Sequence, residues 1–335
     1  MNNAPPVRAI QIVNEEGPDK ALAVVDVPEP EASHMMTPGQ GVLVEVHAAG
    51  VSFPELLQTR GQYQMKPPLP FVPGSEVGGV VISAPGGAAV KAGDRVAAFC
   101  ALGGWAETAV APEYFVFGLQ ELDFAQGAAL VLNYHTAYFS LKLRGRLTEG
   151  ESVLVHGAAG GVGTASLQVA KGLGATTIAT VSSEEKKKVA EEAGADHVVM
   201  VTEGWKDEVV ELSGGGVNLV LDPVGGDRFL DSLRSLREDG RLVVVGFTGG
   251  SIPEVRVNRL LLKNAEVIGA GWGAYVMPKP DLNRVIGAAI SGLIDAGFVR
   301  PLIGQRFALE QAAEALHTLD GRRAVGKVVL DVRGG

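Results

Sequence analysis

Glu151-Ser-Val-Leu-Val-His-Gly-Ala-Ala-Gly-Gly-Val-Gly163 is the stretch around which this 335-residue chain is organised. Its first part, residues 152–156, is predicted to form a short buried strand. The sequence Ala158-x-Gly160-x-x-Gly163 then gives a turn with almost no side chains, which lets the backbone approach a pyrophosphate. Apolar residues at helical spacing follow to Gly174, so the first amides of a helix would face that phosphate. The order of strand, turn and helix predicts a dinucleotide site rather than a loop that merely joins two core elements.

The end of the second predicted strand, residues 176–181, indicates which dinucleotide binds. An acidic side chain about 20 residues after the glycines would hydrogen-bond the ribose 2′-hydroxyl of NAD. Ser182 and Ser183 stand there instead, and Lys186 follows one helical turn later. These groups suit the 2′-phosphate of NADPH, but either serine can also cap the next helix, and both roles can hold at once. The predicted cofactor is therefore NADPH, with its phosphates at Ala159, Gly160, Gly161 and Val162.

Composition and charge exclude several classes of function. The chain has a formal net charge of −9, which argues against a nucleic-acid or an anionic-membrane partner. Its single cysteine, Cys100, rules out a disulfide framework and a cysteine-based zinc cluster. The first residues lack a signal pattern, and no stretch reaches the roughly 18 to 20 apolar residues of a spanning helix. We expect a cytoplasmic protein.

Residues 1 to about 130 have an extended rather than a helical periodicity. Pro and Gly separate the short apolar runs, and only one short helix is predicted, at residues 55–60. Many short strands at close spacing predict an antiparallel, barrel-like domain. The predicted strands are residues 7–13, 21–27, 42–51, 77–83, 95–98 and 106–110.

From Ser152 onward, strands and helices alternate as in a doubly wound parallel sheet. Such sheets bind ligands at the carboxyl ends of their strands. Three loops at that edge favour a cofactor wall, although each alone is also an ordinary strand-to-helix turn. The predicted strands are residues 152–156, 176–181, 196–200, 217–221, 241–246 and 265–269, and the wall residues are Pro223, Val224, Gly246, Phe247, Thr248, Ala270, Gly271 and Trp272. Helices at about 280–296 and 309–319 and a strand at 325–332 complete the chain.

Further motifs extend from near the first strand to the end of the chain: Gly50-Val-Ser-Phe-Pro-Glu-Leu-Leu-Gln-Thr-Arg-Gly-Gln-Tyr63, Pro67-Pro-Leu-Pro-Phe-Val-Pro-Gly-Ser-Glu-Val-Gly-Gly79, Ala92-Gly-Asp-Arg-Val96, Asn133-Tyr-His-Thr-Ala-Tyr138, Leu221-Asp-Pro-Val-Gly-Gly226, Val245-Gly-Phe247 and Gly326-Lys-Val-Val-Leu330. Their order resembles the zinc-independent quinone oxidoreductase branch of the medium-chain dehydrogenase/reductase superfamily. The resemblance implies a GroES-like β-barrel catalytic domain of residues 1–130 and 272–335, with a Rossmann domain of residues 131–271 inserted into it. It also implies an active site between the two domains and a homodimer, with residues 260–268 as the candidate seam.

The resemblance also bears on zinc. Zinc-containing members use a cysteine, a histidine and a further thiolate or carboxylate as ligands, whereas this chain has Ser52 and Ser75 at the first two places and Val131-Leu132 near the third. A neutral serine hydroxyl is a poor zinc ligand. We expect no metal, and a structural rather than a catalytic role for Glu76.

Hydride transfer without a metal requires an acceptor whose charge moves onto an oxygen, as in quinones and α,β-unsaturated carbonyls. Tyr63 is the candidate donor to that oxygen, because related enoyl-thioester reductases have a tyrosine there; packing is the competing role. Thr136 can hydrogen-bond the nicotinamide ribose or the acceptor, or cap its own helix. Ser52, Phe53 and Tyr134 are expected to line the acceptor site, with Phe247 and Trp272 as further flat walls and core packing as the alternative.

Three functions remain open on the sequence. The first is an NADPH-dependent quinone oxidoreductase, and the second is a zinc-independent enone or enoyl-thioester (acyl-CoA) reductase. The third is an NADPH-binding structural or sensor protein with little turnover. The binding loops alone do not distinguish between them.

Overall fold

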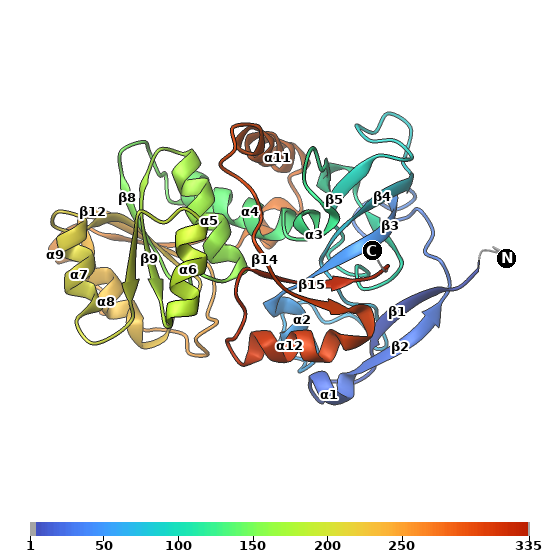
Figure 1. Cartoon of the computed structure of the whole chain (residues 1–335), viewed down its shortest axis with the longest axis horizontal. Helices are drawn as coiled ribbons and strands as arrows, with labels where there is room; N and C mark the ends of the chain where they lie inside the picture. The colour runs from blue at the N-terminus through green and yellow to red at the C-terminus, as the bar shows by residue number, and fades with distance from the viewer. Residues whose placement is uncertain (1–4, 334–335) are drawn as a thin grey trace. The chain divides into compact units, whose positions relative to one another are not determined.

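The computed structural model describes residues 5–333 of the chain (Figure 1). These residues form two compact units: one runs to Leu132 and resumes at Pro301, and the other is Asn133–Arg300. Helices α10 (Trp272–Val276) and α11 (Pro280–Asp295) cluster with the second unit. The predicted boundary after residue 271 instead assigns them to the first domain, so the two divisions differ over residues 272–300.

A seven-stranded sheet forms the frame of the first unit, in the order β14-β15-β3-β4-β5-β7 with β6 paired to β3. All of its pairs are antiparallel except β14 with β15. A separate antiparallel pair, β1 (Val7–Ile12) with β2 (Leu22–Val27), joins this unit through an isolated bridge from Ala9 to Ala106. The sheet strands are β3 (Val42–Val51), β4 (Glu76–Ser83), β5 (Arg95–Phe99), β6 (Thr108–Ala111), β7 (Val116–Gly118), β14 (Ile303–Ala308) and β15 (Lys327–Asp331).

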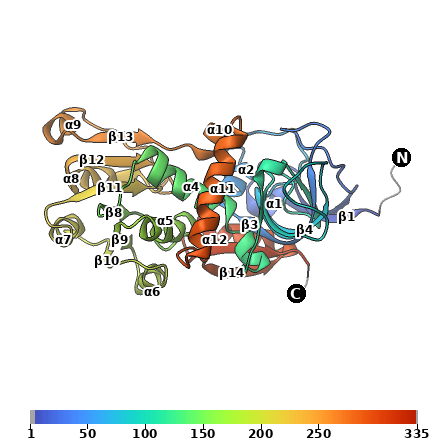
Figure 2. The same ribbon diagram turned by 90° about the horizontal axis from the view of Figure 1, so that it is seen from above.

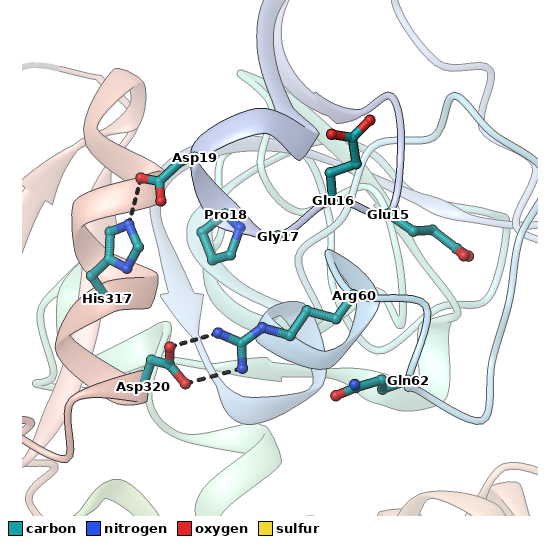
Figure 3. Close-up of a pocket in the computed structure, with 9 residues that line it drawn as sticks. All are labelled: Glu15, Glu16, Gly17, Pro18, Asp19, Arg60, Gln62, His317 and Asp320. Carbon is teal, nitrogen blue, oxygen red and sulfur yellow. Dashed lines mark hydrogen bonds and ion pairs between the residues drawn. The ribbon is translucent and has the colours of Figure 1, made fainter.

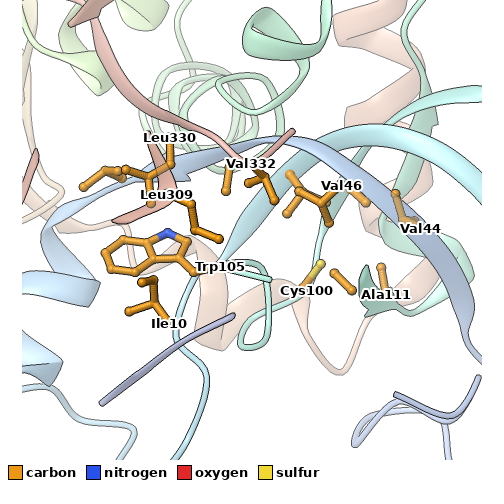
Figure 4. Close-up of a cluster of buried hydrophobic side chains, with 14 of the residues drawn as sticks. Ile10, Val44, Val46, Cys100, Trp105, Ala111, Leu309, Leu330 and Val332 are labelled. Atoms are coloured by element: carbon orange, nitrogen blue, oxygen red, sulfur yellow. The ribbon is translucent and has the colours of Figure 1, made fainter. Parts of the chain in front are cut away.

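Apolar side chains from these strands and from the helix α12 (Ala312–Asp320) enclose the core of the first unit (Figure 4). Trp105 is fully buried in it, and its indole Nε1–H donates to the carbonyl of Gly50 at 3.0 Å. The apolar period of two along β3 to β5 produces this core, as the sequence predicts. Residues 303–332 complete it from the far end of the chain, because β15 pairs with β3.

A parallel six-stranded sheet, in the order β10-β9-β8-β11-β12-β13, forms the frame of the second unit. Its strands are almost continuously apolar because helices cover both faces. Figure 1 shows α5 and α6 side by side, while Leu154, Ile178 and Val220 pack against α7 and α8. The strands are β8 (Ser152–Val155), β9 (Thr176–Val181), β10 (His197–Met200), β11 (Val217–Asp222), β12 (Leu236–Val244) and β13 (Glu266–Gly269). The helices are α5 (Gly161–Gly172), α6 (Glu184–Glu192), α7 (Trp205–Leu212), α8 (Phe229–Arg234) and α9 (Asn258–Lys263).

Three strands differ from the prediction, and one of them, the short β7, is not predicted. β12 begins at Leu236 rather than at residue 241, because Leu236 already pairs with Val217 of β11. An irregularity that contains Asp239, whose φ is 57°, separates this pair from the next one, Arg241 with Leu219. β14 is not predicted at all, since its alternating exposure leaves only a weak apolar pattern. β13 lies at the edge of the sheet next to α9, as Figure 2 shows from above.

Candidate functional site

The glycine turn after β8 has the compact form that the sequence predicts. A Cβ on Gly163 would lie 2.2 Å from the carbonyl oxygen of Gly157 and 2.6 Å from Cα of Ala158, so only glycine lets α5 start this close to the strand. Gly160 precedes α5 in an extended conformation, and Gly161 and Val162 are its half-buried first residues. The first amides of a helix lack intrahelical acceptors and carry a partial positive charge. This end of α5 is therefore suited to bind a phosphate.

The groups predicted for a 2′-phosphate lie together at the end of β9. Ser183 caps α6, with its Oγ accepting the backbone N–H of Lys186 at 3.3 Å. Ser182 is exposed, and the Nζ of Lys186 donates to its Oγ at 3.4 Å. Ser183 thus caps the helix, which is one of the two roles considered for this pair of serines. Ser182 and Lys186 bring a hydroxyl and an ammonium together, and binding of a 2′-phosphate by them stays a prediction.

The loops after β11 and β12 are tied to each other. The Oδ1 of the buried Asp222 accepts the N–H groups of Val224 and Gly225 at 2.8 and 2.9 Å, which fixes the turn after β11. The hydroxyl and the N–H of Thr248 both donate to the carbonyl of Pro223 at 3.1 Å. A Cβ on Gly157 would lie 3.3 Å from Val224, so this loop also contacts the glycine turn. The structure therefore brings Pro223 and Val224 next to the turn. Thr248 is bonded to Pro223, and Gly246 is the second residue of the loop after β12.

The remaining predicted wall residues differ in exposure. Phe247 is 40% exposed, whereas Trp272 is 3% exposed and meets His135 edge-on at 5.9 Å between ring centroids. Ala270 is held by its N–H bond to Val244, and Gly271 after it is exposed. Core packing, the alternative considered for Trp272, accounts for its position in the second unit.

Helix α4 (Val131–Tyr138) carries Tyr134 and Thr136 and continues into a π-helical segment, Phe139–Arg144. Tyr134 is 2% exposed, and its hydroxyl donates to Oε1 of Gln168 at 2.7 Å. This arrangement favours packing rather than contact with an acceptor. Thr136 is also buried, one residue after His135, whose Nδ1 lies 3.0 Å from Oδ1 of Asn283.

Ser52, Phe53 and Tyr63 lie in the first unit, around the short helix α2 (Phe53–Gln58). Ser52 precedes α2, and its N–H donates to Oε2 of Glu55 at 3.0 Å. Phe53 is half-buried and packs against the core of this unit. Burial raises the pKa of the Tyr63 phenol, and the negative charge of Glu55 raises it further. Tyr63 therefore stays neutral and can act as a hydrogen-bond donor.

Strand register places a buried ion pair beside Ser52. Val328 of β15 pairs with Val51 of β3, so Lys327 comes opposite Ser52. The Lys327 ammonium donates to Oγ of Ser52 at 2.6 Å and to Oε1 of Glu76 at 2.5 Å, and Oε2 of Glu76 accepts the N–H of Leu132. The side chains of Lys327 and Glu76 are only 4% and 1% exposed.

A second buried carboxylate, Glu55, lies at the same end of the sheet. It accepts the N–H of Ser75 at 2.9 Å and the hydroxyl of Ser75 at 2.5 Å. Burial raises the pKa of Glu55, while the Ser75 hydrogen bond and the charge of Lys327 act in the opposite direction. Sequence reasoning missed Glu55 and Lys327. The one available signal was Lys327 itself, a charged residue directly after Gly326 at the start of an apolar strand.

Two family profiles match the chain: "Alcohol dehydrogenase GroES-like domain" at residues 38–121 and "Zinc-binding dehydrogenase" at residues 161–287. Quinone oxidoreductase-like protein 2 of Bos taurus is 40% identical over 298 residues, which cover 87% of this chain and 85% of that protein. Quinone oxidoreductase of Rattus norvegicus is 36% identical over 332 residues, 97% of each. The chain belongs to the quinone oxidoreductase branch of the medium-chain dehydrogenase/reductase superfamily. A mycobacterial structure described as complexed with NADPH is also similar, with a TM-score of 0.87 and 33% identity over 97% of this chain and 100% of that one.

Membership in this branch confirms the predicted fold class, a GroES-like domain with a Rossmann domain. The two serines at the expected zinc-ligand positions have other partners. In this member of the branch, Ser52 contacts an ammonium group and Ser75 contacts a carboxylate. Within residues 5–333, no three His, Cys, Asp or Glu side chains are grouped so that they could hold a metal ion. No helix of this part of the chain is long and apolar enough to cross a membrane.

A separate cavity of about 540 Å³ lies in the first unit (Figure 3). Arg60 pairs with both carboxylate oxygens of Asp320, and Nε2 of His317 lies 2.6 Å from Asp19. Glu15 and Glu16 add further negative charge to the lining. A lining with this many carboxylates would repel a dinucleotide phosphate. None of the predicted site residues lines the cavity.

Proposed function

We propose that this protein is an NADPH-dependent quinone oxidoreductase that reduces a quinone or a conjugated carbonyl compound without a metal ion. The observation that carries the proposal is the glycine turn locked against the loop after β11, with Ser182 and Lys186 at the end of the neighbouring strand. The relatives named quinone oxidoreductase and the similar structure complexed with NADPH support it.

The residues of the second unit suit NADPH. Ala159, Gly160, Gly161 and Val162 would hold its pyrophosphate at the start of α5. Ser182, Ser183 and Lys186 would hold the 2′-phosphate, and the loops of Pro223–Val224, Gly246–Thr248 and Ala270–Trp272 would flank the rest. When bound, NADPH supplies a hydride. Thr136 is proposed to position the ribose or the acceptor.

The first unit supplies the groups proposed to face the acceptor. Ser52 and Phe53 would line its site, whereas Tyr134, which is buried, is assigned a packing role in the second unit. Tyr63, whose phenol is held neutral, would donate a hydrogen bond or proton to the acceptor oxygen. A metal ion is not required in this proposal, because a quinone carbonyl already accepts the charge that follows hydride addition.

The test is NADPH oxidation by the purified protein, followed by absorbance, with a panel of quinones, enones and enoyl thioesters. The expected result is a higher kcat/KM for quinones, with NADH a poorer donor than NADPH. Activity should persist after dialysis against a chelator, and metal analysis should find no stoichiometric zinc. Loss of activity on chelation, restored by zinc, would disprove the metal-free part.

The alternative with support from an observation is an enone or enoyl-thioester reductase. The neutral Tyr63 phenol suits an enolate oxygen as well as a quinone oxygen. A higher kcat/KM for an enoyl thioester than for every quinone would select this alternative. Tight NADPH binding without oxidation by any acceptor would instead indicate a structural or sensor role.

We further propose a homodimer through the free edge of the second unit's sheet. β13 is the edge strand, and Leu261 and Leu262 of the adjoining helix α9 are 77% and 74% exposed. An edge strand with apolar side chains beside it offers backbone and apolar contacts to a second copy. Sedimentation of the wild type should give a dimer, and Leu261→Lys with Leu262→Lys should give a monomer.

A further inference from the structure

The buried ion pair of Lys327 and Glu76 contacts one side chain that solvent can reach, Ser52. Lys327 and Glu76 are almost fully enclosed, whereas Ser52, which the ammonium contacts, is half-buried. Burying two charges costs several kcal/mol per ion, and apolar replacement of such pairs is often neutral or stabilising. Stability alone therefore does not account for a lysine and a glutamate in this position.

The backbone around the pair is fitted to it. Glu76 begins β4 opposite the end of β3, and a Cβ on Gly50 would lie 2.7 Å from Cγ and 3.0 Å from Oε1 of this carboxylate. Both oxygens of Glu76 are occupied, one by Lys327 and the other by the N–H of Leu132. The ammonium is consequently fixed in place at the end of the strand.

The directions of these hydrogen bonds leave one donor, the hydroxyl of Ser52, available to bind a ligand. An ammonium has no acceptor lone pair, so the bond of 2.6 Å between Lys327 and Ser52 uses a lysine hydrogen. The hydroxyl hydrogen of Ser52 is then left to donate elsewhere. The nearby Glu55 already accepts the N–H of Ser52 and both the N–H and the hydroxyl of Ser75.

We infer that Ser52 donates a hydrogen bond to the acceptor oxygen on which negative charge develops, and that the positive charge of Lys327 strengthens this bond. The inference rests on the proposed function. Ser52 is the residue that touches the acceptor, Lys327 acts through it, and Glu76 positions the lysine. A fixed internal cation thereby stabilises the developing charge, as a metal ion does in other enzymes, and no proton leaves Lys327.

The kinetic test compares variants with one acceptor quinone. Ser52→Ala should lower kcat/KM by about 100-fold, the usual loss for one oxyanion donor, while the NADPH Kd stays within about twofold. Ser52→Thr keeps the hydroxyl and should restore most of the activity. Because Lys327→Met alone leaves Glu76 unpaired, it is combined with Glu76→Gln; this double variant should fold and be as impaired as Ser52→Ala. Ser75→Ala is the matched control, since its serine contacts a buried carboxylate but no lysine.

A second measurement does not depend on turnover. The anion of 4-nitrophenol mimics a reduced acceptor oxygen and absorbs differently from the neutral form. The wild type should bind the anion preferentially and lower its apparent pKa by about one unit, and Ser52→Ala and the double variant should lose this shift. If the wild type oxidises no NADPH but shows the shift, the proposed function fails, and what stands of the inference is an oxyanion site at Ser52 that Lys327 strengthens. Equal activity and equal anion binding in Ser52→Ala would overturn the inference. So would wild-type activity in the double variant.

Discussion

Ser182 precedes α6 and is exposed, and its contact with the Lys186 side chain is separate from the helix cap, which uses the backbone N–H of Lys186. Ser182→Ala with Lys186→Ala should therefore leave folding intact and remove the groups proposed for the 2′-phosphate. The NADPH Kd should rise by at least about tenfold, equivalent to about 1.4 kcal/mol, with little change for NADH. Fluorescence titration with each cofactor measures both constants. Lys188→Ala, an exposed lysine on the same helix, is the control, and equal losses for NADPH and NADH would reject the site.

Tyr63 is the second residue with a specific role to test. Because burial and the charge of Glu55 raise its pKa, the phenol should remain protonated throughout the neutral and mildly alkaline range. Tyr63→Phe is expected to lower kcat for an enone by at least about 100-fold with cofactor affinity almost unchanged, as for loss of a general acid. Steady-state kinetics with an enone decides this, and unchanged turnover would leave Tyr63 only a packing role.

The sequence predicts well which side chains meet when they are close in the chain, and poorly when they are far apart in it. The serines and lysine after β9 are close in sequence, so helical spacing alone places them together. Ser52 and Lys327 are separated by most of the chain, and only the pairing of β15 with β3 joins them. The sequence predicts Tyr134 and Trp272 as flat walls of the acceptor site. Their burial, however, depends on distant partners such as Gln168 and His135.

Among the elements, the junction of β8 with α5 depends most on the absence of a side chain. In Gly163→Ala the new methyl group would overlap the carbonyl of Gly157, so α5 must shift. The free energy of unfolding should fall by about 1 to 3 kcal/mol, as for an overpacked core. NADPH binding should weaken as well. Denaturant unfolding and cofactor titration measure the two effects.

Gly292→Ala is the matched control for this substitution. Gly292 lies within α11, and a Cβ there meets no atom within 4 Å. Alanine is favoured over glycine inside a helix, so stability should rise by up to about 1 kcal/mol with cofactor binding unchanged. A similar loss in both variants would mean that the tight contact at Gly163 is not responsible.

The elements themselves are largely predictable where their pattern is local. The β8 strand, the turn and α5 follow from glycine positions and apolar spacing. β14 escapes prediction because its side chains alternate between half-buried and exposed, so the strand is defined by its pairing with β15. The irregular start of β12 around Asp239 is likewise a property of pairing.

Considering the whole molecule, two buried histidines should make its stability depend on pH. His156 lies between the hydroxyls of Thr180 and Ser232, and burial lowers its pKa to about 4; burial likewise lowers the pKa of His135 to about 4. In the unfolded chain both start from 6.5. Between these values only the unfolded state binds the protons, so stability is lost as pH falls from 6.5 to 4.

Denaturant unfolding at pH 7 and at pH 5 tests this dependence. Each histidine should contribute about 2 kcal/mol of the loss at pH 5, by linkage. His156→Gln keeps one donor and one acceptor but does not titrate, so it should remove about 2 kcal/mol of the pH dependence. The same slope in the variant would show that other groups cause it.

The division of the chain into units is the least predictable feature at this scale. Sequence marks α11 as an apolar helix after the last parallel strand, but it does not say which unit buries that face. In the structure Asn283 meets His135, and α11 packs on α5, so the helix stays with the second unit. Such long-range contacts leave no periodic pattern in the sequence.

The burial of Cys100 has a consequence if quinones are the substrates, as proposed. Quinones arylate thiolates, and a cysteine that reacts in this way inactivates the protein that carries it. The only thiol of this chain is fully buried, and burial, with the nearby charge of Glu76, raises its pKa to about 12. Since the thiolate is the reactive form, the folded protein offers a quinone no reactive thiolate. It should therefore withstand repeated turnover of these electrophiles without self-inactivation and without a protective reductant.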